Sequence, residues 1–189
     1  LKDAGGRRTV GPGEPIGVRE DGTWTVPEPE LALVLGRGGR IVGATAGNDV
    51  TSRDIEGANP LYLPQAKVFA GACSLGPVVV TPDEWPPEFE IHCRIFGADG
   101  AVVWEGKTST ARMKRSFDEL VSWLVRDNPV APGTVLLTGT GLVPPDDVTG
   151  NVTATIRDQP WDLALETILR AYGLAAEELP SGIIRVDAI

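Results

Sequence analysis

Two apolar runs separated by a glycine-rich turn constrain this chain more than any other feature. Leu31–Leu35 is followed by Gly-Arg-Gly-Gly at residues 36–39, and a second apolar run occupies residues 41–46. Glycine accepts the positive φ angles that a tight reversal needs. The sequence therefore predicts that the two runs pair as an antiparallel β-hairpin.

Three carboxylates flank this hairpin. Glu28 and Glu30 lie two residues apart just before the first run, and side chains two apart on a strand point to the same face. The returning strand brings Asp49 back to the same end of the hairpin. Unpaired carboxylates at close range repel one another and raise each other's pKa values, so a cation between them would be stabilising.

An all-oxygen donor set of this kind suits Mg²⁺, Mn²⁺ or Ca²⁺ and does not suit Zn²⁺. The sequence thus predicts a divalent-metal site formed by Glu28, Glu30 and Asp49. The alternative is that these residues are solvated acids at the end of a strand in an acidic protein.

Charge and length exclude several other classes of protein. The net charge is −9 and the pI is about 4.6, whereas a nucleic-acid surface needs clustered Lys and Arg. No apolar run approaches the length of about 20 residues that a membrane-spanning helix needs. A chain of 189 residues has room for one domain, or for one domain and a small module.

The few cysteine and histidine residues indicate no catalytic or zinc-binding role. Cys73 and Cys93 are expected to be free, buried thiols, since two cysteines in a chain of this size do not make a disulfide framework. His92 is the only histidine and has no partner at a metal-ligand spacing. We therefore expect it to be structural, and no Ser-His-Asp triad is expected.

The remaining pattern predicts a β-rich α+β fold, with one helix packed on antiparallel strands. Ser116 and Glu119 form a capping box, and apolar residues at helical spacing follow as far as Asn128-Pro129. Residues 56–66 lack any periodicity and are expected to form a loop. Strands are expected at residues 16–19, 75–81, 89–96, 101–104, 107–113 and 134–138.

Several motifs in register resemble the fumarylacetoacetate hydrolase family. They are Pro-Glu-Pro-Glu-Leu-Ala-Leu-Val-Leu (27–35), Gly-Asn-Asp-Val-Thr-Ser-Arg-Asp (47–54), Leu-Pro-Gln-Ala-Lys (63–67), Ser-Leu-Gly-Pro (74–77) and Leu-Leu-Thr-Gly-Thr-Gly (136–141). The sequence of residues 62–67 is most similar to that of the family branch that dehydrates 2-keto-3-deoxy sugar acids. The resemblance covers residues 1–147 and implies a mixed β-sheet roll or barrel that lacks the family's N-terminal lid.

The resemblance also implies a mechanism and a set of site residues. A divalent metal would stabilise an enolate of a small 2-keto acid, an intermediate shared by dehydration, C–C hydrolysis and decarboxylation. Arg53 and Lys67 are the implied catalytic residues, and both would bind substrate oxygens together with Gly139 and Thr140. Lys2 matches a family lysine near the substrate. The implied location is the cytoplasm, and the expected partners are the 2-keto acid and a second copy of the chain.

The sequence changes character after residue 147. A strand at residues 151–157, an apolar helical stripe from Pro160 to Tyr172, and a hairpin around residues 180–182 are predicted. This β-α-β-β pattern resembles the short N-terminal domain of secretins and TonB-dependent receptors, which implies the cell envelope. We predict two units, 1–147 and 148–189, and we expect the second unit to pack independently.

Three interpretations remain open at this point. The chain is a metal-dependent enzyme of 2-keto acids or the core of one, a non-enzymatic binding module of the cell envelope, or an inactive fragment or fusion. Metal dependence separates the first from the other two.

Overall fold

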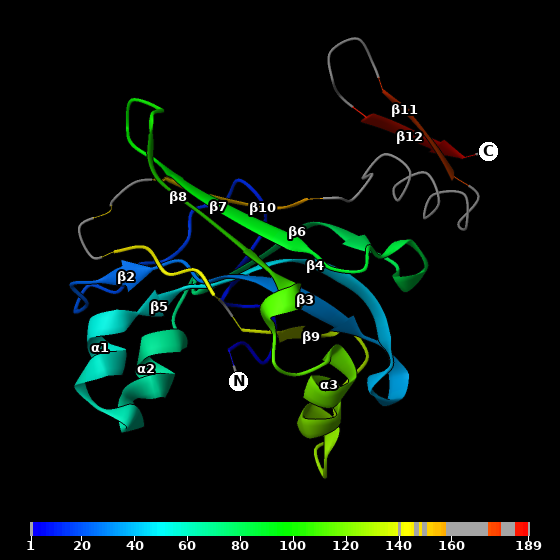
Figure 1. Cartoon of the computed structure of the whole chain (residues 1–189), viewed down its shortest axis with the longest axis horizontal. Coiled ribbons are helices and arrows are strands. Elements are labelled where there is room, and N and C mark those ends of the chain that lie inside the picture. The colour runs from blue at the N-terminus through cyan, green and yellow to red at the C-terminus, as the bar shows by residue number, and fades with distance from the viewer. Residues whose placement is uncertain are drawn as a thin grey trace.

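The fold is a set of curved β-sheets with few helices, in the computed structural model shown in Figure 1. The structure describes residues 2–139, 141–145, 148, 151–157, 174–178 and 184–188. The predicted β-rich α+β class is confirmed. No helix in this described part is both long and apolar enough to cross a membrane.

The described part of the chain contains twelve strands and seven short helices. The strands are β1 (Thr9–Val10), β2 (Thr25–Val26), β3 (Pro29–Leu35), β4 (Ile41–Asp49), β5 (Thr51–Ser52), β6 (Cys73–Val80), β7 (Glu90–Phe96), β8 (Val102–Ser109), β9 (Thr134–Leu137), β10 (Asn151–Arg157), β11 (Leu174–Glu178) and β12 (Ile184–Ala188). The α-helices are α1 (Arg53–Ala58), α2 (Leu63–Lys67) and α3 (Phe117–Val125). The 3₁₀-helices are η1 (Arg37–Gly39), η2 (Pro60–Tyr62), η3 (Pro82–Glu84) and η4 (Thr110–Arg112).

The predicted hairpin is the centre of the largest sheet. β3 and β4 pair antiparallel, with Glu30 opposite Gly47 and Leu31 opposite Ala46. The strand order of this sheet is β1-β6-β4-β3-β9. A second sheet, β10-β7-β8, is antiparallel throughout.

The alternation along β3 sends its leucines into the core. Leu31, Leu33 and Leu35 are almost fully buried and belong to one apolar cluster with Ile91 of β7 and Val121 of α3. Residues Glu28 and Glu30 lie at the start of the same strand segment, two residues apart. The core therefore holds rigidly the strand from which the acidic residues project.

Helix α3 confirms Ser116 as the predicted N-cap. The Ser116 hydroxyl accepts a hydrogen bond from the Glu119 backbone N–H at 3.1 Å, which satisfies one of the free donors of the first turn. The predicted free thiols, Cys73 and Cys93, are buried and unpaired by any disulfide. His92 is also buried, with Nε2 2.7 Å from Glu105 Oε1.

Three local expectations are wrong. The separate strands expected at 101–104 and 107–113 form one strand, β8, which ends at Ser109 and is followed by η4. The predicted loop 56–66 is largely helical, because Asn59 caps η2 through the Leu61 N–H and prolines at the starts of η2 and α2 preset helical φ. These helices bury almost no apolar face, and so they leave no periodic signal. The expected strand 16–19 does not form, although the Gly17 N–H donates to the Gly71 carbonyl at 2.9 Å.

The expected independence of residues 151–157 is also wrong. β10 pairs antiparallel with β7 along its whole length, from Asn151 opposite Phe96 to Arg157 opposite Glu90. β7 would otherwise present an open edge on the side away from β8, and an open edge is a strong template for a further strand. The predicted hairpin is present as the pair β11–β12, whereas the helix predicted from Pro160 to Tyr172 lies outside the described residues.

This pairing predicts different effects for two C-terminal deletions. Removing residues 151–189 takes away one of the two strands that pair with β7. It should lower the free energy of unfolding by more than about 4 kcal/mol, an effect of the size seen when a hydrophobic core is damaged. That corresponds to a fall in melting temperature of at least about 8 °C in a chain of this size. Removing only residues 158–189 leaves the β10–β7 ladder in place and should cost much less. Equal melting temperatures of the two deletions, measured by circular dichroism, would contradict the role assigned to β10.

Candidate metal centre

Three carboxylates converge at one end of the central hairpin. Glu28, Glu30 and Asp49 each offer an oxygen, and these oxygens all lie within 4.8 Å of one another. The side chains of Glu28 and Glu30 are deeply buried, with residue exposures of 5% and 4%. The convergence predicted from the hairpin is therefore present in the structure.

Backbone pairing explains why the carboxylates meet. The Asp49 N–H donates to the Glu28 carbonyl at 2.9 Å, and the Asn48 side-chain oxygen accepts from the Glu28 N–H at 3.0 Å. These bonds extend the β3–β4 ladder by one step beyond the paired residues Pro29 and Asn48. The register thus places Glu28 and Asp49 side by side.

Two cationic side chains from the helical segment enter the same site. Lys67, the last residue of α2, places Nζ 3.0 Å from Glu28 Oε2 and 3.0 Å from Asp49 Oδ2. Its third partner is the Thr51 hydroxyl at 2.7 Å. Arg53, the first residue of α1, lies 2.9 Å from Glu28 Oε1 and also forms an ion pair with Glu56.

A third cation reaches Asp49 from the N-terminal segment. Lys2 Nζ contacts Asp49 Oδ1 and donates to the Val50 carbonyl at 2.6 Å. Burial lowers the pKa of Lys2, and the neighbouring Asp49 carboxylate partly opposes that shift. Burial alone would also lower the pKa of Lys67, but the carboxylates of Asp49 and Glu28 outweigh it, so the pKa of Lys67 is raised and the ammonium keeps its proton.

Glu30 stands apart from the other two acids. Its Oε2 accepts a hydrogen bond from the Gly139 N–H at 2.6 Å, and no ion pair to it is found in the part of the chain that the structure describes. Burial raises the pKa of Glu30 to about 7, and the Gly139 N–H only partly opposes this shift. Glu30 is therefore the one carboxyl group of the three without an ion pair in the described residues, although Lys67 acts on it at longer range.

These residues fit a hard divalent cation. The donor set is entirely oxygen, which favours Mg²⁺, Mn²⁺ or Ca²⁺. The buried Glu30 carboxylate forms no ion pair within the described residues, and a bound cation would supply a direct positive partner. Lys67 and Lys2 already neutralise part of the charge on Glu28 and Asp49, so the cation and the ammonium groups would share these two carboxylates.

The structure brings together nearly all of the predicted site residues. Glu28, Glu30, Asp49, Arg53 and Lys67 form one cluster, and Gly139 joins it through Glu30. Thr140 lies outside the described residues. The roles assigned to these residues in substrate binding and catalysis stay predictions.

Sequence reasoning missed two members of the cluster. The Thr51 hydroxyl orients Lys67, and Glu56 holds Arg53 from the next turn of α1. The spacing of three residues between Arg53 and Glu56 is the signal that could have found the second, had the segment been read as a helix. No comparable feature of the sequence identified Thr51 as a member of the cluster.

The curved β-rich fold carries a buried carboxylate cluster at one end of its central hairpin, and comparison with known proteins identifies the family. Residues 5–159 match the family described as fumarylacetoacetate (FAA) hydrolase C-terminal. The chain belongs to the fumarylacetoacetate hydrolase family.

Two relatives are dehydratases of keto sugar acids. The chain is 54% identical over 158 residues to a "Probable 2-keto-3-deoxyxylonate dehydratase" of Haloferax volcanii, covering 82% of this chain and 50% of the relative. It is 50% identical over 142 residues to a 2-dehydro-3-deoxy-D-arabinonate dehydratase of Saccharolobus solfataricus, covering 74% of this chain and 47% of the relative. The chain thus spans about half the length of these relatives.

A solved structure supports the same fold. It is a 2-keto-3-deoxy-D-arabinonate dehydratase complexed with magnesium and 2,5-dioxopentanoate, with a TM-score of 0.75 and 48% sequence identity. The match covers 79% of this chain and 55% of that one. The expected family fold is therefore confirmed, and the predicted strand 151–157 falls inside the matched family region.

Proposed function

We propose that this chain carries the metal-dependent centre of a lyase that dehydrates a 2-keto-3-deoxy sugar acid. The observation that carries the proposal is the convergence of Glu28, Glu30 and Asp49 with the cations Lys67 and Arg53. The names of the two dehydratase relatives and the magnesium complex of the solved homologue support the reaction and the metal.

Each residue has a role that follows from its position. Glu28, Glu30 and Asp49 would hold Mg²⁺, with Mn²⁺ or Ca²⁺ as alternatives. When bound, such a cation supplies Lewis-acid chemistry that polarises a carbonyl and favours loss of a proton beside it. Lys67 keeps its proton at Nζ and presents positive charge where negative charge develops on the substrate.

Arg53 would bind the substrate carboxylate. Its guanidinium is a planar fork suited to two carboxylate oxygens, and it is now occupied by Glu28 and Glu56. Substrate binding would therefore exchange an internal carboxylate for an external one. Gly139 and Thr140 would contact the substrate at the end of β9, where small residues allow close approach.

Dehydration is preferred to the other reactions of the family on the strength of the relatives' names. C–C hydrolysis and decarboxylation would use the same charge arrangement around a 2-keto acid, so the carboxylate cluster does not choose among them. The family match and the convergence of Glu28, Glu30 and Asp49 with Lys67 and Arg53 favour an enzyme over a binding module or an inactive fragment.

Three further assignments belong to this proposal. We assign the chain to the cytoplasm and to a homodimer, in keeping with a small-molecule enzyme. We also keep a division into two units, but place it after the family match, which ends at residue 159, and not at residue 147. The β11–β12 hairpin supports a separate tail, whereas the pairing of β10 with β7 removes the first predicted strand from it.

A binding experiment tests the proposed site. Pyruvate, a minimal 2-keto acid, is expected to bind in isothermal titration calorimetry when Mg²⁺ is present and to lose at least about tenfold in affinity, or about 1.4 kcal/mol, after EDTA treatment. The reason is that the keto and carboxylate oxygens need the cation as a partner. Acetate, which lacks the keto group, is the matched control ligand. Pyruvate binding of equal strength with and without Mg²⁺ would refute the proposed arrangement.

A further inference from the structure

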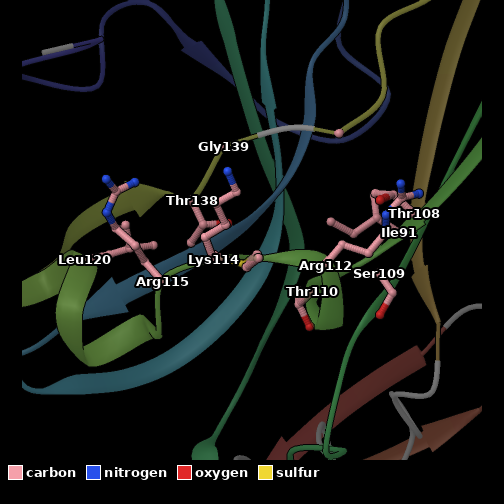
Figure 2. Close-up of a pocket in the computed structure, with 12 residues that line it drawn as sticks. Ile91, Thr108, Ser109, Thr110, Arg112, Lys114, Arg115, Leu120, Thr138 and Gly139 are labelled. Carbon is pink, nitrogen blue, oxygen red and sulfur yellow. The ribbon is translucent and has the colours of Figure 1, made fainter.

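A concave site lined by basic residues includes Gly139, whose N–H also contacts the carboxylate cluster. It is a pocket of about 300 Å³ between β7, β8, the loop that follows η4, helix α3 and the end of β9 (Figure 2). We call it the basic pocket. Its walls are Ile91, Thr108, Ser109, Thr110, Arg112, Met113, Lys114, Arg115, Leu120, Thr138, Gly139 and Gly141.

The charge of this lining is opposite to that of the molecule. Arg112, Lys114 and Arg115 all line the basic pocket and no acidic residue does, although the chain carries a net charge of −9. In the described part of the chain, the only ion pair of these cations joins Arg115 Nε to Glu119 at 3.5 Å. A concave wall with one sign of charge concentrates the electrostatic field and raises the local concentration of ions of the opposite sign.

Two hydroxyl groups of the lining can also donate hydrogen bonds. The Ser109 hydroxyl accepts from the Ala111 N–H at 3.1 Å, and the Thr110 hydroxyl accepts from the Phe89 N–H at 2.9 Å. Each hydroxyl still has its own hydrogen to donate. Three cations and these hydroxyl hydrogens make a lining rich in donors, which matches a ligand whose oxygens only accept hydrogen bonds.

Apolar side chains complete the basic pocket. Ile91, Met113 and Leu120 contribute carbon surface, and Figure 2 shows Leu120 beside Arg115. Small-molecule sites combine such apolar surface with a few placed polar groups, and a volume near 300 Å³ is at the lower end of their range. The size therefore suits a small metabolite.

The basic pocket is distinct from the metal centre. Glu28, Glu30 and Asp49 do not line it. The two sites share one peptide, because Gly139 forms part of the wall and its N–H donates to Glu30 Oε2 at 2.6 Å. A ligand in the basic pocket would thus be detected at the Gly139 amide.

We propose that the basic pocket binds the carboxylate or phosphate group of a small organic anion. Arg112 and Lys114 supply the main charge, since neither is paired with a carboxylate in the described part of the chain, and the hydroxyls of Ser109 and Thr110 supply directional donors. The basic pocket shares Gly139 with the proposed substrate site, but its charged residues lie outside the carboxylate cluster, so its binding is tested without metal.

The test uses amide chemical shifts of the metal-free full chain at constant ionic strength. Inorganic phosphate is one probe and succinate, a dicarboxylate, is the other. At least one of them is expected to shift the amides of Thr108, Gly139 and Gly141 in a saturable way at millimolar concentration. The probe that binds more tightly identifies whether the natural ligand is a phosphate or a carboxylate.

Two double variants, each of which removes two positive charges, make the test specific to the basic pocket. The double variant Arg112→Gln/Lys114→Gln is expected to weaken the tighter probe at least tenfold. The control Arg37→Gln/Arg40→Gln removes two exposed positive charges elsewhere and should change its affinity less than twofold. Saturable shifts confined to the basic pocket that follow this pattern support the proposal. Absence of saturation up to 50 mM of either probe, or equal weakening by both double variants, overturns it. Because metal is absent throughout, either result leaves the proposed metal site to its own tests.

Discussion

Millimolar Mn²⁺ is expected to raise the melting temperature of the wild-type chain, and the Glu30→Gln variant is expected to lose this response. A ligand at 100 times its dissociation constant stabilises the folded state by about 2.7 kcal/mol. In a chain of this size, that corresponds to a rise of about 5–10 °C. Differential scanning fluorimetry with and without Mn²⁺ measures both values.

Glu30 is the informative position because the other two acids already have cationic partners. Gln keeps an oxygen that can accept the Gly139 N–H, which Glu30 accepts at 2.6 Å, but it cannot supply negative charge to a cation. The loss of the Mn²⁺ response would therefore report the missing charge and not a missing hydrogen bond.

The pH dependence of the metal-free protein separates loss of the site from loss of the fold. Burial raises the folded-state pKa of Glu30 from 4.5 to about 7. The stability contributed by the protonated group is thus complete below pH 4.5 and is lost as the pH rises through 7. At pH 8 in EDTA, Glu30→Gln is accordingly expected to be at least as stable as the wild type.

Glu20→Gln is the matched control, because Glu20 is exposed. Its melting temperature should respond to Mn²⁺ as the wild type does. A Glu30→Gln variant that keeps the full Mn²⁺ response would show that the cation binds elsewhere. If Mn²⁺ leaves the melting temperature of the wild type unchanged, the proposed metal site is refuted.

Replacement of Lys67 by Met is expected to have the second large effect. If the chain dehydrates 2-keto-3-deoxy-D-arabinonate, Lys67→Met should lower kcat by about 10²–10³-fold, the usual loss when one preorganised charge at the reacting group is removed. Met retains the bulk and flexibility of the lysine stem while removing its charge. Steady-state kinetics with saturating Mg²⁺ measures the change.

The neighbours of Lys67 predict a second consequence for this variant. Lys67 Nζ lies 3.0 Å from both Glu28 and Asp49, so its removal leaves two carboxylates short of positive charge. The metal-free variant should be less stable than the wild type, and Mn²⁺ should raise its melting temperature by more. Loss of turnover together with a retained Mn²⁺ response assigns the effect to the chemistry and not to the metal.

Lys107→Met is the matched control, since Lys107 is an exposed lysine on β8. It should leave kcat within about twofold of the wild-type value, as expected for a surface change away from the site. Equal kcat values for the wild type and Lys67→Met would exclude Lys67 from the reaction.

The sequence alone determined the hairpin and the carboxylate cluster. A glycine-rich turn between two apolar runs leaves few ways to pair the runs, and the two-residue period of a strand then sets which side chains share a face. Glu28, Glu30 and Asp49 consequently converged as predicted. The α3 cap was equally local, because Ser116 and Glu119 are three residues apart.

Arg53 and Lys67 were placed by resemblance to a family, because no local rule specifies how a short helical segment folds back over a hairpin. α1 and α2 are nearly without buried apolar residues, and so their helical form left no periodic trace in the sequence. Their position depends on long-range contacts such as Lys67 with Glu28, which are 39 residues apart. The tertiary structure therefore decided how the cations reach the acids.

The tertiary structure also decided which strand residues 151–157 pair with and where the basic pocket lies. An alternating strand pairs with whichever edge is available, and the sequence does not reveal that β7 has an open one. The basic pocket likewise joins residues of β7, the segment around η4, and the end of β9, which are far apart along the chain. The spacing of residues along the chain determines which side chains share a face of a hairpin. Which distant segments pair with one another depends on the whole fold.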